Sequence, residues 1–117
     1  MSKYMFTAHY SSGSWARLVR NYDDRTIALR SLIESLGGTL EALYWAAHSL
    51  AAHAIAELPD SISAKAVVTT TVETGAFTSV EAQELLSEEQ LHDTLLLSRS
   101  AAEFYQAPGK SAIEAAY

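Results

Sequence analysis

Cysteine is absent from the 117-residue sequence. Its absence excludes a disulfide framework, a thiolate metal site and a cysteine nucleophile. The same absence fits a protein that works in a reducing compartment. Because the first residues also lack the apolar stretch of a signal peptide, we expect a cytoplasmic protein.

Long hydrophobic runs are absent too. The longest stretch of low charge, residues 42–56, is interrupted by His48, Ser49 and His53. A helix that spans a membrane needs about 20 consecutive apolar residues. We therefore expect a soluble chain with no membrane partner.

Positive charge is scarce, with 8 Lys and Arg residues against 14 Asp and Glu residues and a net charge of −6. Four basic residues lie in one segment: Arg17, Arg20, Arg25 and Arg30. Asp23 and Asp24 lie among them, which is typical of a solvated helix face. Because binding to nucleic acid needs a clustered positive face, we expect no nucleic-acid partner.

Glycine is sparse, at 5 residues, and forms neither a Gly-x-Gly-x-x-Gly pattern nor a P-loop. We therefore expect no nucleotide cofactor, and no other cofactor is indicated. The length predicts a single domain with one core.

Alternation of apolar and polar side chains predicts four strands, over residues 4–10, 39–47, 50–58 and 77–85. In the first strand, alternate residues from Tyr4 to Tyr10 share one apolar face. A tight connection at His48 and Ser49 is expected to join the second and third strands into a hairpin.

Helical spacing predicts helices over residues 15–22, 23–36 and 64–74 and from residue 87 onward. Ser14 is the expected N-cap of the first helix. Asp23 and Asp24 are expected in the first turn of the second helix, which Gly37 ends. Ser87 and Gln90 form a capping-box pattern at the start of the last helix.

Residues 64–74 carry conflicting signals. The β-branched run from Val67 to Val72 favours a strand. The apolar residues nevertheless follow helical spacing from Ala64, and Gly75 lies where a helix would stop. Because periodicity is the stronger signal, we predict a helix.

The order of these elements predicts an α+β fold. Split β-α-β units of this order make a ferredoxin-like four-stranded antiparallel sheet with helices on one face. The other face would expose a large apolar patch, so we expect a homodimer in which a second copy covers it. The domain is expected over residues 1–98, followed by a C-terminal arm or tail over residues 99–117.

Four blocks, in this order and at these intervals, resemble the GYD-domain family: Lys3-Tyr4-Met5-Phe6, Ser35-Leu36-Gly37-Gly38, Glu57-Leu58-Pro59-Asp60 and Leu85-Leu86-Ser87-Glu88-Glu89. The resemblance covers residues 3–97. It implies the dimeric α/β barrel of the wider ferredoxin-like superfamily, in which two sheets pack face to face. It implies little about activity, because a fold does not specify a function.

The sequence departs from that family in the run that gives the family its name. The family has an aromatic-Gly-Asp-Tyr-Asp-like run at the hairpin between the second and third strands. The corresponding residues here are Ala47-His48-Ser49-Leu50-Ala51. No role of the family's run can be transferred to them.

Histidines and aromatic residues of the strands form the candidate site. His9 and His53 are expected on neighbouring central strands. A histidine in an apolar cavity titrates near neutral pH, and adjacent aromatic rings orient an aromatic substrate. The predicted catalytic residues are His53 and His9, and the predicted ligand-binding residues are Tyr44, Trp45, Tyr10 and His48.

Three functions are compatible with these residues. Some relatives in the wider superfamily act on aromatic or polyketide-like substrates without cofactors, so the resemblance implies a small-molecule-binding protein or a cofactor-independent enzyme. The alternative is a non-catalytic interaction or regulatory module that uses the C-terminal arm. The third is a metal protein in which His9, His53 and Glu41 or Glu84 are ligands, although no closely spaced histidine pair supports it.

Overall fold

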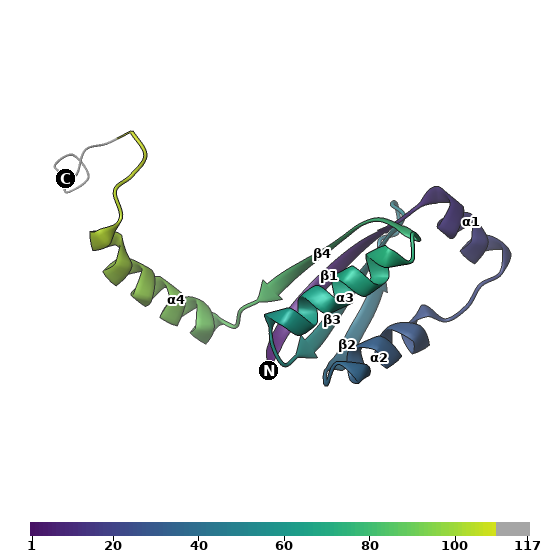
Figure 1. The fold of residues 1–117 in the computed structure, drawn as a ribbon, viewed down its shortest axis with the longest axis horizontal. Coiled ribbons are helices and arrows are strands. Elements are labelled where there is room, and N and C mark those ends of the chain that lie inside the picture. Colours follow the sequence, from purple (N-terminus) through teal and green to yellow (C-terminus); the bar gives the residue numbers. More distant parts are fainter. Residues whose placement is uncertain (110–117) are drawn as a thin grey trace. The chain divides into compact units, whose positions relative to one another are not determined.

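The computed structural model describes residues 1–109 of the chain (Figure 1). Its elements are β1 (Ser2–Tyr10), α1 (Ser12–Arg20), α2 (Arg25–Ser35), β2 (Thr39–Trp45), β3 (Ala51–Leu58), α3 (Ser61–Glu73), β4 (Phe77–Leu85), α4 (Glu88–Ala101) and a short 3-10 helix (Ala102–Phe104). The chain divides into two compact units, residues 1–85 and residues 86–117. The predicted domain boundary after residue 98 falls within α4, and part of the predicted arm lies outside the described residues.

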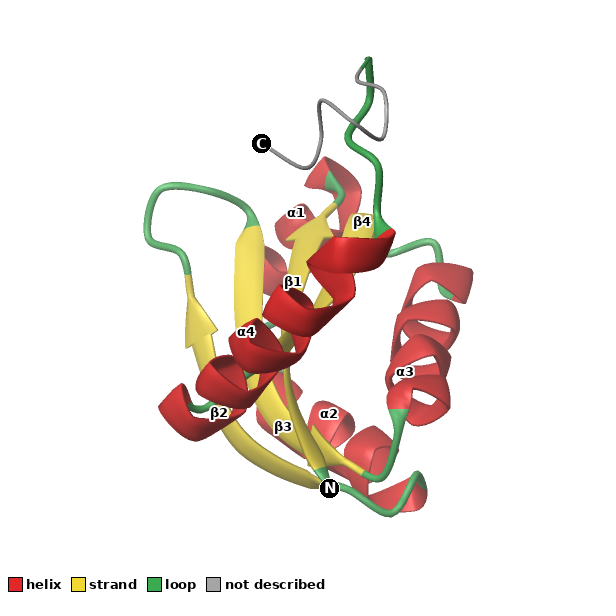
Figure 2. Ribbon diagram, turned by 90° about the vertical axis from the view of Figure 1, so that its left-hand side faces the viewer, coloured by secondary structure: helices red, strands yellow, loops and turns green. Residues whose placement is uncertain are grey.

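The four strands form one antiparallel sheet in the order β2-β3-β1-β4. The described residues therefore have the predicted ferredoxin-like α+β fold. Helices α2 and α3 lie on the same side of this sheet (Figure 2). The two central strands are β1 and β3, as the sequence predicts.

The core lies between the sheet and helices α2 and α3. Its buried members are Tyr4, Phe6, Ile33, Ala54, Ala56, Leu58, Ala64 and Val67. Alternate β1 residues face the helices, which confirms the predicted apolar face of the first strand. On β3 the corresponding positions are mostly alanine, and Ala52, Ala54 and Ala56 are all buried.

The conflict over residues 64–74 is resolved as predicted, in favour of helix α3. The hydroxyls of Thr69 and Thr71 donate to the carbonyl oxygens of Lys65 and Val67, at 2.9 and 2.8 Å. These bonds satisfy polar groups that would otherwise compete with the helical backbone. Val67 is almost fully buried, so packing against the sheet outweighs the β-propensity of this segment.

Two predicted helix starts need correction. Ser11, and not Ser14, is the N-cap of α1, because Ser11 keeps extended backbone angles and its side chain accepts from the Ser14 amide. Helix α2 begins at Arg25, and Asp24 is its N-cap because its carboxylate accepts from the Thr26 amide. Asp23 and Asp24 thus precede the helix rather than forming its first turn.

Two other predicted helix-end signals are confirmed, whereas α1 ends at Arg20 and not at residue 22, and α3 begins at Ser61 and not at residue 64. Gly37 follows α2 with a φ of +82°, a conformation that glycine adopts without steric cost. Ser87 and Gln90 form the predicted capping box of α4, with hydrogen bonds of 3.1 and 2.9 Å between each side chain and the other residue's backbone amide. A glycine after a helix and a capping-box pair at its start are specific signals of helix ends, because each fits a particular backbone geometry.

The hairpin between β2 and β3 is confirmed, but its connection is longer than predicted. The strands end at Trp45 and resume at Ala51, so residues 46–50 form the loop. Two-residue hairpin turns need positive φ angles. Among the described residues only glycines have positive φ, and this loop contains none.

The N-cap of α3 predicts a pH-dependent contribution to stability. The Asp60 carboxylate accepts a hydrogen bond of 2.8 Å from the Ser63 amide, which holds the pKa of Asp60 below its ordinary value. A lowered pKa means that this stabilisation is present above the unfolded-state pKa and is lost as pH falls through the folded-state pKa. We therefore expect Asp60→Ala to lower the free energy of unfolding at neutral pH, and the deficit to shrink in acid.

Urea unfolding of wild type and Asp60→Ala at neutral pH and below about pH 4 measures this change. Glu73→Gln, at the opposite end of α3, is the control and should show no such loss at neutral pH, since it caps no amide. A deficit for Asp60→Ala that stays equal at both pH values would contradict the assignment.

None of the helices within the described part of the chain has the length and apolar character needed to cross a membrane.

Candidate functional site

The sheet register places the predicted site residues on two opposite faces. Tyr10 and Trp45 lie on the face that meets the helices, together with Phe6 and Ala52. His53 pairs with Tyr44 on one side and Thr7 on the other, and these residues lie on the opposite face. The structure therefore brings the predicted residues together in two groups rather than in one pocket.

The opposite face, here called the outer face, carries Met5, Thr7, His9, Tyr44, His53 and Ile55. Thr7 Oγ1 lies 3.2 Å from His53 Nδ1, within hydrogen-bond distance. His9 is two residues along β1 from Thr7 and pairs with Ala51. His48 is in the exposed loop of residues 46–50, apart from both groups.

Histidine and carboxylate side chains do not converge into a metal site within residues 1–109. No group of three or more potential ligands occurs there. Glu41, one of the carboxylates considered as a ligand, instead pairs with Lys3 at 3.1 Å. The catalytic roles predicted for His9 and His53 stay predictions.

A cavity of about 690 Å³ lies on the helix face of the sheet. We call it the helix-side pocket. Its floor comes from all four strands, and its walls come from α1, α2 and α3; Phe6, Leu43, Ala54, Val80, Leu18, Leu29 and Val67 are representative. This volume lies within the range of small-molecule sites, and most of these lining side chains are apolar.

An aromatic cluster borders one end of the pocket. The Tyr10 ring lies 4.6 Å from Phe77, 5.5 Å from Trp45 and 6.0 Å from Trp15, measured between ring centroids. Trp15 and Trp45 are themselves 5.8 Å apart. Such spacings and tilted rings are those of favourable aromatic pairs. Trp15 and Phe77 were not predicted as site residues, although both are aromatic residues at the ends of predicted elements.

Tyr10 is the central ring of this cluster, and the pKa of its phenol is shifted. Burial raises the pKa of Tyr10, and the nearby positive charge of Arg25 only partly offsets the effect. The phenol is therefore neutral at physiological pH and remains a hydrogen-bond donor.

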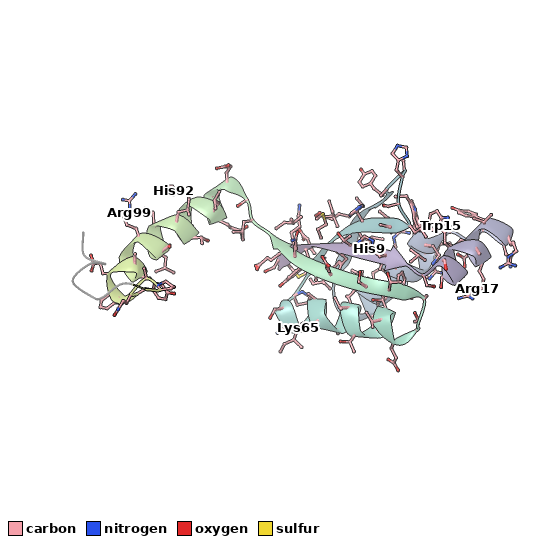
Figure 3. The ribbon with its side chains drawn as sticks, turned by 90° about the horizontal axis from the view of Figure 1, so that it is seen from above. His9, Trp15, Arg17, Lys65, His92 and Arg99 are labelled. Carbon is pink, nitrogen blue, oxygen red and sulfur yellow. The ribbon has the colours of Figure 1, made fainter. Side chains whose placement is uncertain are left out.

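Arginines line the pocket beside these rings. Arg17, Arg20 and Arg25 all contribute to it, and Arg17 and Arg20 are also exposed to solvent, so they lie at its opening. Figure 3 labels Trp15 and Arg17 on α1 and His9 on β1. The acidic residues among these arginines predict a solvated helix face instead. The signal that could have identified them is the concentration of arginine in one segment of an acidic chain.

The family of the chain follows from its sequence and agrees with this fold. The family model described as the GYD domain matches residues 4–95. The chain belongs to the GYD domain family. This confirms the resemblance expected from the four sequence blocks, whereas a comparison with curated proteins found no significant match. Membership in this family does not by itself assign a substrate or an activity to the chain.

The loop between β2 and β3 contains Ala47 to Leu50, which are expected to correspond to the family's signature run. The Tyr10 amide donates to the Leu50 carbonyl oxygen at 2.7 Å, and the Ala46 amide donates to Ala51 at 3.0 Å. This loop therefore adjoins the backbone of the residue at the centre of the aromatic cluster.

Proposed function

We propose that this GYD domain binds a small aromatic molecule in the helix-side pocket. The observation that carries the proposal is a cavity of about 690 Å³ whose apolar floor ends at the rings of Tyr10, Trp45 and Phe77. Aromatic rings recognise planar ligands by stacked or edge-on contacts. Two of the four predicted ligand-binding residues, Tyr10 and Trp45, belong to this pocket.

The same proposal includes a homodimer in which the outer faces of two sheets pack into an α/β barrel. Ile55, Met5 and Ala42 form an apolar row across three strands of the outer face, and Gln83 continues the row on β4. Removal of this apolar row from water would favour association. A barrel of this type would leave the helix-side pocket of each subunit outside the interface.

Catalysis is a narrower hypothesis than binding. His9 and His53 lie on the outer face, so acid–base chemistry by them requires a substrate there, inside the proposed dimer. Tyr10 is the titratable side chain of the helix-side pocket with a raised pKa. Ligand binding in that pocket requires neither His9 nor His53. The cytoplasmic location of the protein remains a prediction.

An interaction module is the second candidate function, and α4 supports it. No residue of α4 is buried, and Leu95 and Leu97 are 58% and 72% exposed. Large apolar side chains on one exposed helix are typical of protein-contact surfaces.

Filling the helix-side pocket is expected to abolish binding of a neutral aromatic probe. Ala28 lines the pocket and is exposed on α2, so Ala28→Phe adds a ring to the cavity without disturbing the core. We expect the affinity for phenylnaphthylamine, followed by its fluorescence, to fall about tenfold or more.

Two variants control for other binding surfaces. Ile27→Phe changes the adjacent α2 residue, which is 67% exposed and does not line the pocket, and Tyr44→Ala changes the outer face. Both should bind the probe as wild type does. Unchanged binding by Ala28→Phe, or lost binding by Tyr44→Ala alone, would contradict the proposed pocket.

A further inference from the structure

We propose that the ligand of the helix-side pocket is an aromatic acid, whose ionised group is held by Arg17 and Arg25. This inference rests on the proposed function and adds the chemical class of the ligand. It starts from the charges that line the cavity. Those charged residues are Arg17, Arg20, Arg25 and Asp23.

The charge of the pocket is opposite to the charge of the protein. Three of the 8 Lys and Arg residues line this cavity, against one of the 14 Asp and Glu residues, while the chain carries −6. Clefts lined by one sign of charge attract ligands of the opposite sign. A positive opening in an acidic protein therefore favours an anion.

Arg17 is held in place by a buried hydroxyl. Its Nη2 donates to Ser14 Oγ at 3.0 Å, and Ser11 Oγ donates to the same oxygen at 3.0 Å. Ser14 is only 6% exposed and lines the pocket. A guanidinium has five N–H donors, so this bond fixes Arg17 while leaving donors for a ligand. An arginine fixed in this way suits a planar carboxylate, which it can bind through two parallel bonds.

Arg25 provides a second cation beside a neutral donor. Its Nη1 lies 3.2 Å from Asp23 Oδ2, and both Arg25 and Tyr10 line the pocket. The phenol keeps its proton at neutral pH, so it can donate to an anion that approaches Arg25. An acid bound here would place its charge at the arginines and its ring against Tyr10, Trp45 and Phe77.

The size of the cationic site argues for one acidic group. Arg20 Nε donates a hydrogen bond to the Ala16 carbonyl oxygen at 3.4 Å, and the Arg25 guanidinium forms a salt bridge with Asp23. The pocket thus has one arginine, Arg17, that is fixed with free donors and a second, Arg25, whose charge is partly neutralised by Asp23. Both lie beside a largely apolar floor. A polyphosphate would need more cations, whereas a single carboxylate or sulfonate on an aromatic body matches both parts.

Two fluorescent probes that differ in one charged group test this inference. Anilinonaphthalene sulfonate is an aromatic anion, and phenylnaphthylamine is its neutral analogue. We expect Arg17→Gln and Arg25→Gln to weaken binding of the sulfonate about tenfold each, since each loses a charge-assisted hydrogen bond. Binding of the neutral probe should change less than about twofold, because the apolar floor is intact.

Arg30→Gln is the matched control. Arg30 lies on α2 with Arg25 and does not line the pocket, so its replacement makes the same change in net charge. It should leave both affinities unchanged. Added salt should weaken binding of the sulfonate and not of the neutral probe.

The outcomes separate this inference from the proposed function. If neither probe binds the wild-type helix-side pocket, as judged with Ala28→Phe, the proposed function fails and the acid specificity fails with it. If the neutral probe binds there but neither arginine variant changes sulfonate affinity, only the acid specificity is overturned. An equal loss for both probes in the arginine variants would also overturn it, because the arginines would then support the pocket rather than bind the anion.

Discussion

Gly38→Ala is expected to lower the free energy of unfolding by about 3 kcal/mol, an overpacking effect at the upper end of the usual range. Gly38 is buried between the end of α2 and β3. A Cβ atom there would overlap the Glu57 carbonyl oxygen and lie 2.7 Å from Leu58 Cδ2 and 3.1 Å from Ile33 Cγ2. The carbonyl belongs to a central strand, so it cannot move without disturbing the sheet.

Urea unfolding followed by circular dichroism measures the effect, with Gly13→Ala as the matched control. Gly13 lies within α1, and a Cβ atom there would come no closer than 3.9 Å to Arg17. Alanine favours a helix interior over glycine by up to about 1 kcal/mol, so the control should be neutral or stabilising. Equal unfolding midpoints for Gly38→Ala and wild type would show that the β3 backbone can yield at this contact.

Ile55→Lys is expected to convert the proposed homodimer into a monomer. Ile55 lies in the middle of the outer face, between Met5 on β1 and Ala42 on β2. A lysine in a sheet-to-sheet interface would bury an unpaired charge, which weakens association roughly a hundredfold or more. Native mass spectrometry should give twice the 12.7 kDa chain mass for wild type and a single chain mass for the variant.

Two further variants separate loss of the interface from loss of the fold. Tyr44→Lys changes a side chain that is 66% exposed on the outer face, so it should fold normally and yet also lose the dimer. Val72→Lys places the same charge on α3, where the side chain is 45% exposed, and should remain dimeric. A wild-type protein with a single chain mass, or an Ile55→Lys variant that stays dimeric, would overturn the barrel.

The fold could be predicted from the sequence because each element buries one periodic face. Alternation from Tyr4 to Tyr10 marks β1, and helical spacing from Ala64 outweighs the β-branched residues of α3. The errors lie at the ends of elements. Ser11 and Ser14 are equivalent as N-cap residue types, and only the path of the chain after β1 selects Ser11.

The candidate site was less predictable than the fold, although the sequence does indicate which strand residues lie on opposite faces of the sheet. Adjacent strand residues point to opposite faces, so His9 and Tyr10, or Tyr44 and Trp45, cannot share a pocket on a regular sheet. The arginines of the pocket could not be predicted in the same way. They come from α1 and the start of α2, and the position of these segments over the sheet is a tertiary property that no local pattern encodes.

Strand β1 is made before the other strands of the sheet and lies between two strands that follow much later in the chain. Its neighbours β3 and β4 begin at Ala51 and Phe77, and Lys3 finally pairs with Glu57 and Leu85. Loops of this length lose entropy before their contacts form, which slows folding relative to a helical protein of equal size. During synthesis the central strand therefore lacks its partners until β3 and β4 have been made, and its exposed apolar face favours aggregation of the incomplete chain.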